Sequence, residues 1–272
     1  DTNGDGLFTA ADTTEPTNGL DLEWEYQDYS DASGEPNETS SSVSVRSFTG
    51  SVELDRTVYP VPIGTNQFEL HAPATGYLEA TPVNIVIRVN DPDANVSANG
   101  EDTLSTSVLK LEIARGSDKE LIIINSTELV EIAPDAGIFE VDVEIDQQTF
   151  AGLNGGIEQG DIIQVQYTDP ADASGDSNSV TDSATFDLRN GVIQTDKSVY
   201  IIGSDVIFTL IEPDLDLDSE TEETWDLDLI NWDSDAGDLN LSDDVFDAEP
   251  FGLRETGPST GIFQVVIEIP DE

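Results

Sequence analysis

The first twelve residues, DTNGDGLFTAAD, place oxygen-bearing side chains at alternate positions around a Gly-Asp-Gly turn. Ca²⁺ binds about six to eight hard oxygen atoms, and a short loop can supply them only if alternate residues point inward. Gly6 stands where such a loop turns sharply, and a carbonyl, a hydroxyl and a closing carboxylate follow it. The predicted calcium ligands of this loop are Asp1, Asn3, Asp5, Leu7 through its carbonyl oxygen, Thr9 and Asp12.

The spacing of these ligands resembles an EF-hand-type calcium loop, in the Asp-closed form that is typical of dockerin repeats. We therefore expect residues 1–19 to form a calcium-binding loop that stands alone. The alternative is an acidic linker that matches the pattern by chance, since acidic residues are abundant throughout the chain.

A second kind of acidic motif recurs three times, in NDPDAN, TDPADASGD and EPDLDLD. Proline fixes a turn in each motif, and carboxylates gathered at an inter-strand or interdomain corner can share a calcium ion. The alternative is that these acids only form polar turns. The candidate ligands are Asp91, Asp93 and Asn95; Asp169, Asp172 and Asp176; and Asp214, Asp216 and Asp218.

Catalytic chemistry finds little support in the residue types present. The chain has one histidine, His71, and no cysteine, so neither a Ser-His-Asp arrangement nor a His-based zinc site can be assembled convincingly. Acid pairs of the kind that glycosidases use occur everywhere among 58 acidic residues and carry no information. We expect a protein that is not an enzyme.

The charge of the chain selects its partners. Against 58 acidic residues there are 9 basic ones, and the formal net charge is −49. Such a charge repels nucleic acid and anionic membranes, and it attracts divalent and small monovalent cations. No apolar run approaches the length of a membrane span, and the absence of methionine is expected of a processed or excised segment.

An internal repeat organises the chain. The stretch 25–45 aligns with 166–186, so that Tyr26 corresponds to Tyr167 and, further on, Gly50 to Gly191, each 141 residues later. Downstream, residues 134–145 align with 258–269 at an offset of 124, which places an insertion in the first copy near residues 65–84. We predict that 20–49 are the closing strands of a preceding domain, that 50–189 are a complete domain, and that 190–272 are a second domain, which stops before the counterpart of 157–167. In an alternative arrangement, 20–49 of one molecule complete the unfinished domain of a neighbour.

Period-two alternation gives the fold class. Residues 139–145, FEVDVEI, separate an apolar face from an acidic face, and LEWEY (22–26) and WDLDL (225–229) do the same. In the complete domain we expect seven strands, near 52–59, 83–89, 104–114, 119–132, 137–145, 161–167 and 183–188. The sequence therefore predicts an all-β protein of tandem immunoglobulin-like β-sandwich domains.

The strand sequences GIFEVDVEI (137–145) and GIFQVVIEI (261–269), the entry SVYIIG (198–203) and the DPD-type turns resemble the surface-layer (S-layer) proteins of ammonia-oxidising archaea. The resemblance implies a cell-surface lattice built from copies of one immunoglobulin-like chain, stabilised by divalent cations and without enzyme activity. Acidic pores in such a lattice would enrich cations such as ammonium and exclude anions.

Four N-glycosylation sequons, at Asn37, Asn95, Asn125 and Asn240, also favour an extracellular location. Two other functions are compatible with the same features. A calcium-dependent extracellular adhesin or ligand-binding module would stay monomeric until its receptor appears, whereas a lattice protein assembles alone. A secreted halophile domain, acidic only for solubility, would keep its fold in concentrated salt with a chelator present.

Overall fold

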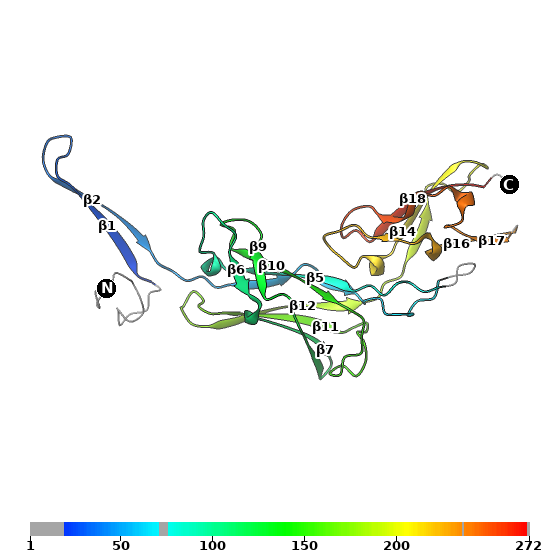
Figure 1. The fold of residues 1–272 in the computed structure, drawn as a ribbon, viewed down its shortest axis with the longest axis horizontal. Helices are drawn as coiled ribbons and strands as arrows, with labels where there is room; N and C mark the ends of the chain where they lie inside the picture. The colour runs from blue at the N-terminus through cyan, green and yellow to red at the C-terminus, as the bar shows by residue number, and fades with distance from the viewer. Residues whose placement is uncertain (1–18, 71–75, 236, 271–272) are drawn as a thin grey trace.

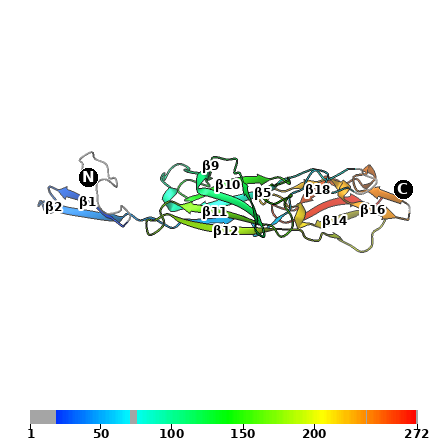
Figure 2. The same cartoon turned by 90° about the horizontal axis from the view of Figure 1, so that it is seen from below.

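The computed structural model describes residues 19–70, 76–235 and 237–270, and its elements are almost entirely β-strands (Figure 1). A hairpin, a first domain and a second domain follow one another in a row along the molecule (Figure 2). The predicted all-β class is confirmed. The predicted loop ligands Asp1 to Asp12 and His71 lie outside the described residues.

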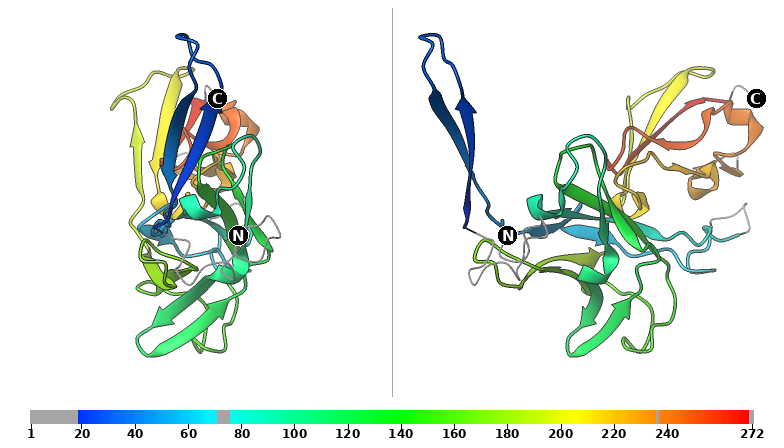
Figure 3. Two further views of the ribbon diagram at one scale, coloured as in Figure 1. Left: turned by 90° about the vertical axis from the view of Figure 1, so that its left-hand side faces the viewer. Right: turned by 60° about the vertical axis from the view of Figure 1, so that its left-hand side comes forward.

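The hairpin consists of β1 (Asp21–Asp28) and β2 (Asn37–Ser44), which form a two-stranded sheet of their own. It stands apart from both domains (Figure 3). Its turn is closed by Asp31, which accepts hydrogen bonds from the N–H (2.7 Å) and the hydroxyl (2.6 Å) of Ser33. No element among the described residues packs on this sheet, and nearly all of its side chains are exposed.

Two five-stranded sheets face one another in the first domain, and the core lies between them. One sheet has the order β3 (Ser51–Leu54), β5 (Val83–Asn90), β10 (Ile138–Ile145), β9 (Glu128–Glu131), β6 (Thr103–Ser105). The other has the order β4 (Val58–Pro60), β12 (Asn178–Asp187), β11 (Ile162–Asp169), β7 (Leu109–Arg115), β8 (Asp118–Ile122). Phe139 and Val143 of β10 are buried as the alternation predicts, and Tyr59 and Phe186 pack against each other from the opposite sheet.

Three of the seven predicted strands are each divided in two by the structure. The expected strands 52–59, 104–114 and 119–132 become β3 and β4, β6 and β7, and β8 and β9, respectively. In each case the two halves belong to opposite sheets, because the chain crosses the edge of the sandwich in the middle of an apolar stretch. Alternation alone cannot locate such a crossing, since both halves bury side chains in the same core.

The inserted segment of the first domain is an antiparallel extension. Ile63 bridges to Thr81 and Glu69 bridges to Tyr77, and the backbone bond from Leu78 N to the carbonyl oxygen of Phe68 (2.9 Å) continues the pairing. Within the predicted insertion near 65–84, the described residues on either side of 71–75 therefore pair in antiparallel fashion.

The second domain repeats one sheet of the first. Its order is β13 (Val192–Thr195), β14 (Asp205–Ile211), β19 (Ile262–Glu268), β18 (Glu249–Glu255), β15 (Thr224–Trp225), which matches β3-β5-β10-β9-β6 strand for strand. Opposite this sheet, the described residues contribute only the small hairpin of β16 (Asn231–Ser234) and β17 (Gly237–Asn240). The second layer of this domain thus lacks counterparts of β11 and β12 within the part of the chain that the structure covers.

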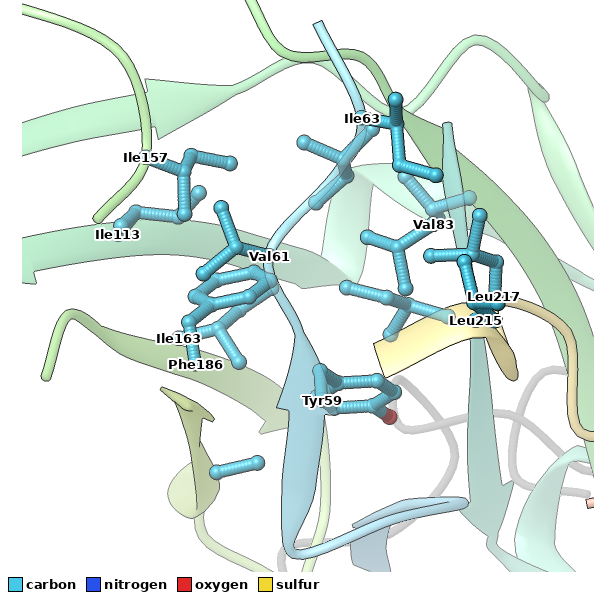
Figure 4. Packing of buried hydrophobic residues seen from close by; sticks show 14 of the residues in the cluster. Tyr59, Val61, Ile63, Val83, Ile113, Ile157, Ile163, Phe186, Leu215 and Leu217 are labelled. Carbon is cyan, nitrogen blue, oxygen red and sulfur yellow. The ribbon is translucent and has the colours of Figure 1, made fainter. Parts of the chain in front are cut away.

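Apolar side chains join the two domains. Leu215 and Leu217 of the second domain lie against Val83 and Tyr59 of the first (Figure 4). The N–H of Asn84 donates to the carbonyl oxygen of Leu217 at 2.8 Å, so the backbone of β5 is also tied to the second domain. Leu217 is 2 % exposed, and the junction therefore has a dry centre.

Candidate metal centre at the domain junction

The acidic loop after β14 approaches the first domain because its turn is locally fixed. Pro213 begins the short 3-10 helix η3 (Pro213–Leu215), and the Glu212 carboxylate accepts the N–H of Asp214 at 3.3 Å. In the first domain η1 (Pro92–Ala94) is built in the same way, with Asp91 accepting the N–H of Asp93 at 2.9 Å. The loop that follows η3 carries Asp216 to the junction.

Three carboxylates converge behind this loop. Asp216, Glu223 and Glu255 each present an oxygen, and these three oxygens lie within 4.8 Å of one another. Glu223 precedes β15 and Glu255 ends β18, so two paired strand ends hold their positions. Asp216 is 6 % exposed and Glu255 is 2 % exposed, which makes this a buried acidic cluster.

Backbone donors fix how the carboxylates point. The Oε1 atom of Glu223 accepts the N–H groups of Leu217 (2.9 Å) and Asp218 (2.6 Å). The Oε1 atom of Glu255 accepts the N–H groups of Thr260 (2.7 Å) and Gly261 (2.8 Å). The second oxygen of Glu223, Oε2, is buried and receives no hydrogen bond from an N–H or O–H group of the described residues, so a hydrogen bond between the Glu223 and Glu255 side chains requires a shared proton. An anionic oxygen in that position needs a proton or a cation.

The pKa values of the cluster also indicate that it requires a proton or a cation. Burial, together with the hydrogen bond shared with Glu255, raises the pKa of Glu223 to about 8. Burial acts in the same direction on Glu255, but the hydrogen bonds from Glu223, Gly261 and Thr260 outweigh it and hold the pKa of Glu255 below its usual value. Without a cation, the Glu223–Glu255 pair therefore binds a proton more tightly than an ordinary carboxyl group does.

One positive side chain reaches the cluster from the first domain. Arg56 donates from Nη2 to Asp216 Oδ1 at 2.5 Å and from Nη1 to the carbonyl oxygen of Asp216 at 2.6 Å. Burial raises the pKa of Asp216, and the Arg56 guanidinium opposes that effect. Arg56 balances one of the three carboxylates and leaves Glu223 and Glu255 facing each other.

A second acidic group crosses the junction itself. Glu140 and Asp142 of β10 and Glu220 of the second domain also bring three oxygens within 4.8 Å of one another. Arg88 pairs with Glu140 and lies 3.3 Å from Glu220, from Nη2 to Oε1. Burial, followed by the charge of Glu140, raises the pKa of both Asp142 and Glu220. A cation bound here would contact both domains.

Asp216 is the only calcium ligand predicted from the sequence that belongs to either of these two carboxylate groups. Its neighbours in the motif serve the loop: Asp214 accepts the N–H of Arg189 (2.8 Å), and Asp218 accepts those of Glu220 (2.9 Å) and, from the side chain, Asn84 (3.4 Å). The last contact ties the loop to the first domain.

The first acidic motif, NDPDAN (90–95), contacts the linker that leads into the first domain. Asp93 accepts the N–H of Phe48 (2.9 Å), and Asp169 accepts the N–H of Gly50 (2.8 Å). Asp91 accepts the hydroxyl of Tyr167. The structure thus brings Asp91, Asp93 and Asp169 near one another, but each already receives a donor from the protein.

The remaining predicted ligands take part in turns. Asp172 accepts the N–H (2.8 Å) and hydroxyl (2.5 Å) of Ser174, and the carbonyl oxygen of Asp176 accepts the N–H of Asp172 (2.9 Å). For this motif the described contacts are those of polar turn chemistry. The side chain of Asn95 donates to Asp135 (3.1 Å), while its Oδ1 is buried without a hydrogen-bond partner.

Asn95 occupies the position in the first domain that Asp216 has in the second. Asp102 stands in the place of Glu223 and accepts the N–H groups of Val96 and Ser97, each at 2.7 Å. Glu131 stands in the place of Glu255 and accepts the N–H of Gly137 at 2.7 Å. The same backbone-fixed loop is therefore built twice, and the second copy carries the additional carboxylate.

Glu223, Glu255, Glu140, Asp142 and Glu220 were not predicted as ligands. A signal for one of them was present, because Glu131 and Glu255 each stand six residues before the glycine of a GIF strand. The others are ordinary members of an acidic surface pattern until the two domains meet. Among the sequons, Asn240 is 2 % exposed and donates its amide to the carbonyl oxygen of Asp228, so its side chain is occupied in the fold.

Comparison with known proteins does not assign the chain to a family: no protein-family model matches it, and no curated protein matches it either. Among the described residues there is no helix that is long and apolar enough to cross a membrane.

Proposed function

We propose that the chain is a structural component of a cell-surface layer whose domains are held in a fixed relation by calcium. The observation that carries the proposal is the junction, where two carboxylate clusters meet with too few positive partners. Eight of the nine basic side chains already form ion pairs, so the protein has almost no positive charge left to neutralise them. Cations from solution are the remaining source.

The proposed building block is an immunoglobulin-like β-sandwich used in tandem. Support comes from the two-layered first domain, from the repetition of its sheet order in the second domain, and from the resemblance to archaeal S-layer sequences. In this proposal the chain lies outside the cell, binds copies of itself in a two-dimensional lattice, and is not an enzyme. Its acidic surfaces enrich small cations such as ammonium and repel anions.

At the junction, Ca²⁺ would displace the proton between Glu223 and Glu255 and would remove the repulsion among the carboxylates by binding to all of them. Asp216, Glu223 and Glu255 offer the hard oxygens that Ca²⁺ prefers, and Glu140, Asp142 and Glu220 would hold an ion between the two domains. Cations at these places would stiffen a linear array of domains that contains no cysteine and therefore no disulfide.

Electron microscopy of the full chain, dialysed against calcium or against EDTA, tests this function. We expect ordered sheets with calcium alone and their loss with EDTA. The variant Glu223→Gln should weaken the calcium effect, whereas Glu144→Gln, an equal change of charge at an exposed position of β10, should not. A chain that stays monomeric with calcium until a receptor is added would instead be an adhesin, and the lattice proposal would be wrong.

A further inference from the structure

One outer face of the first domain carries almost no acidic side chain. It belongs to the sheet that contains β12, β11, β7 and β8. On β11 the outward residues are Ile162, Gln164, Gln166 and Thr168, and on β12 every outward residue from 179 to 185 is serine or threonine. We call the outward side chains of 162–168, 179–185, 110–114 and 119–121 the neutral face. Asp187, at the end of β12, marks its border.

The one carboxylate within the described neutral face is already neutralised. Glu112 of β7 pairs with Lys110 (2.6 Å, from Nζ to Oε2) and with Lys119 of β8. Glu112 is 8 % exposed, and the hydrogen bonds from the two lysines hold the pKa of Glu112 below its usual value. The neutral face thus carries two positive charges and one negative charge, in a chain with a formal net charge of −49.

The opposite sheet of the same domain has the reverse character. The outward residues of β10 include Glu140, Asp142 and Glu144, and β3 of the same sheet adds Glu53. Arg88 of β5 is the only basic side chain on the outward side of these three strands. Two copies that met through this sheet would bring carboxylates against carboxylates, which is unfavourable.

The internal repeat shows that strands of this type do not have to be neutral. The hairpin β1–β2 aligns with β11–β12 at the offset of 141 residues and is paired in the same register. Four outward positions that are exposed carboxylates in the hairpin are uncharged in the first domain. The corresponding residues are Asp21 and Ile162, Glu23 and Gln164, Glu25 and Gln166, and Glu38 and Ser179.

The neutral face is open to contact across its width, whereas the edge of its sheet is not. The layer of β12, β11 and β7 lies on the outer side of the first domain, and no other described element lies beyond it (Figure 1). At the edge strand β8, the N–H of Gly152 donates to Glu120 at 2.5 Å. A Cβ atom at Gly152 would lie 2.1 Å from the carbonyl oxygen of Lys119, so this loop approaches the edge closely. A partner therefore meets the face of the sheet rather than this edge.

We propose that the neutral face is a contact surface between copies of this chain, in which the face of one copy packs against the same face of a second copy about a two-fold axis. A two-fold contact joins identical patches, so the patch must tolerate its own charge at close range. The neutral face meets this condition, and the acidic face of the opposite sheet does not. The inference deepens the proposed function by naming one contact between copies, and it rests on that proposal for the biological use of the contact.

The residue types of the neutral face suit contact with themselves. Glutamine, serine and threonine side chains both donate and accept hydrogen bonds, so they can pair with the same residue types across the axis. Ile162 and Leu121 are 44 % and 60 % exposed and supply apolar area to bury. A polysaccharide would be expected to stack on aromatic rings, and the described neutral face contains none. Nucleic acid and anionic membranes are repelled by the rest of the chain.

Returning the missing charge tests the contact. The double variant Gln164→Glu/Gln166→Glu gives β11 the residues that β1 has at the same positions. In EDTA, at an ionic strength high enough to screen the net charge, sedimentation velocity over a concentration series should show a dimer of the parent chain. The double variant should raise the dissociation constant of the dimer by about tenfold or more, because its like charges meet at close range.

A matched control carries the same change of charge elsewhere. The variant Gln27→Glu/Gln264→Glu adds two carboxylates at exposed strand positions outside the neutral face and should dimerise like the parent. Equal dissociation constants for the two double variants would overturn the inference. A parent chain that stays monomeric at every ionic strength would also overturn it.

Mixing variants of opposite charge tests the two-fold arrangement and shows that the variants are folded. Gln164→Lys/Gln166→Lys should also weaken the dimer of that chain alone, since two basic faces would meet. An equimolar mixture of the lysine and glutamate variants should dimerise at least as tightly as the parent chain. If the lysine variant alone associates more tightly than the parent, the neutral face binds an acidic surface of another copy, and the two-fold contact is wrong.

A calcium series separates this inference from the proposed function. The dimer should form without calcium, because the carboxylate of Glu112 is bound by two lysines. If calcium gives neither stability nor sheets, while the dimer forms and is weakened in Gln164→Glu/Gln166→Glu, the calcium proposal fails and the contact stands. If calcium gives sheets that Gln164→Glu/Gln166→Glu forms equally well, the contact is wrong and the proposed function stands.

Discussion

The substitution Glu223→Gln should change how the stability of the protein depends on pH. In the calcium-free protein the pKa of Glu223 is raised from its ordinary 4.5 to about 8, so the folded state binds more protons than the unfolded chain between these pH values. The free energy of unfolding must therefore fall as the pH rises through this window. Glutamine resembles the protonated carboxyl and removes this contribution.

The size of the effect follows from the displacement of the pKa. A rise from 4.5 to about 8 corresponds to roughly 5 kcal/mol for a fully desolvated group. Glu223 is half-buried and shares its proton with Glu255, so we expect about 2–4 kcal/mol between pH 5 and pH 9. Above pH 8 the variant should be more stable than the parent chain by this amount when no calcium is present.

Urea unfolding followed by Trp fluorescence, measured at several pH values in EDTA and in saturating calcium, checks this expectation. Calcium requires the ionised carboxylate, so it should remove the fall with pH in the parent chain and should have little effect on Glu223→Gln. The control Glu144→Gln should behave like the parent. Parallel pH profiles for the parent chain and Glu223→Gln in EDTA would refute the assignment of a shared proton to this cluster.

Three further substitutions test contacts at the domain junction and within the first domain. Arg56→Leu leaves the buried Asp216 without its cation and should lower the free energy of unfolding by about 3–5 kcal/mol in urea. The double variant Arg56→Leu/Asp216→Leu should restore most of this loss. Equal losses for the single and the double variant would contradict the pairing. Leu217→Ala should lower the free energy of unfolding by about 2–4 kcal/mol because it leaves a cavity at the buried junction. Val96→Ala, at the exposed counterpart in the first domain, should be nearly neutral. Similar losses for the two variants would show that the junction is not packed. Tyr167→Phe removes the hydroxyl bonded to a buried carboxylate and should cost about 1–3 kcal/mol by thermal melting, and an unchanged melt would remove that contact from the account.

The fold class could be predicted because burial imposes a period of two on each strand. Phe139 and Val143 are buried and Glu144 is exposed, as the alternation requires. The same rule placed Trp24 and Tyr26 on the apolar face of a half-buried strand, and both side chains are more than half exposed among the described residues. The alternation identifies the apolar face, but it does not identify what covers that face.

The candidate site could be predicted only in part. Asp216 was recognisable because a turn motif carries it, and turn motifs are local in sequence. Glu223 and Glu255 lie 32 residues apart and meet through the pairing of β15 with β18, while Arg56 reaches Asp216 from 160 residues away. In a chain with 58 acidic residues, only the tertiary contacts distinguish the few carboxylates that converge from the many that face solvent.

The central claim is that the junction carboxylates hold calcium, and electron density from crystals grown with Ca²⁺ tests it most directly. The account predicts a strong peak between Asp216, Glu223 and Glu255, at about 2.3–2.6 Å from one oxygen of each. A second peak is expected among Glu140, Asp142 and Glu220. Density for water alone at both places, with Glu223 and Glu255 still within hydrogen-bond distance of each other, would contradict it.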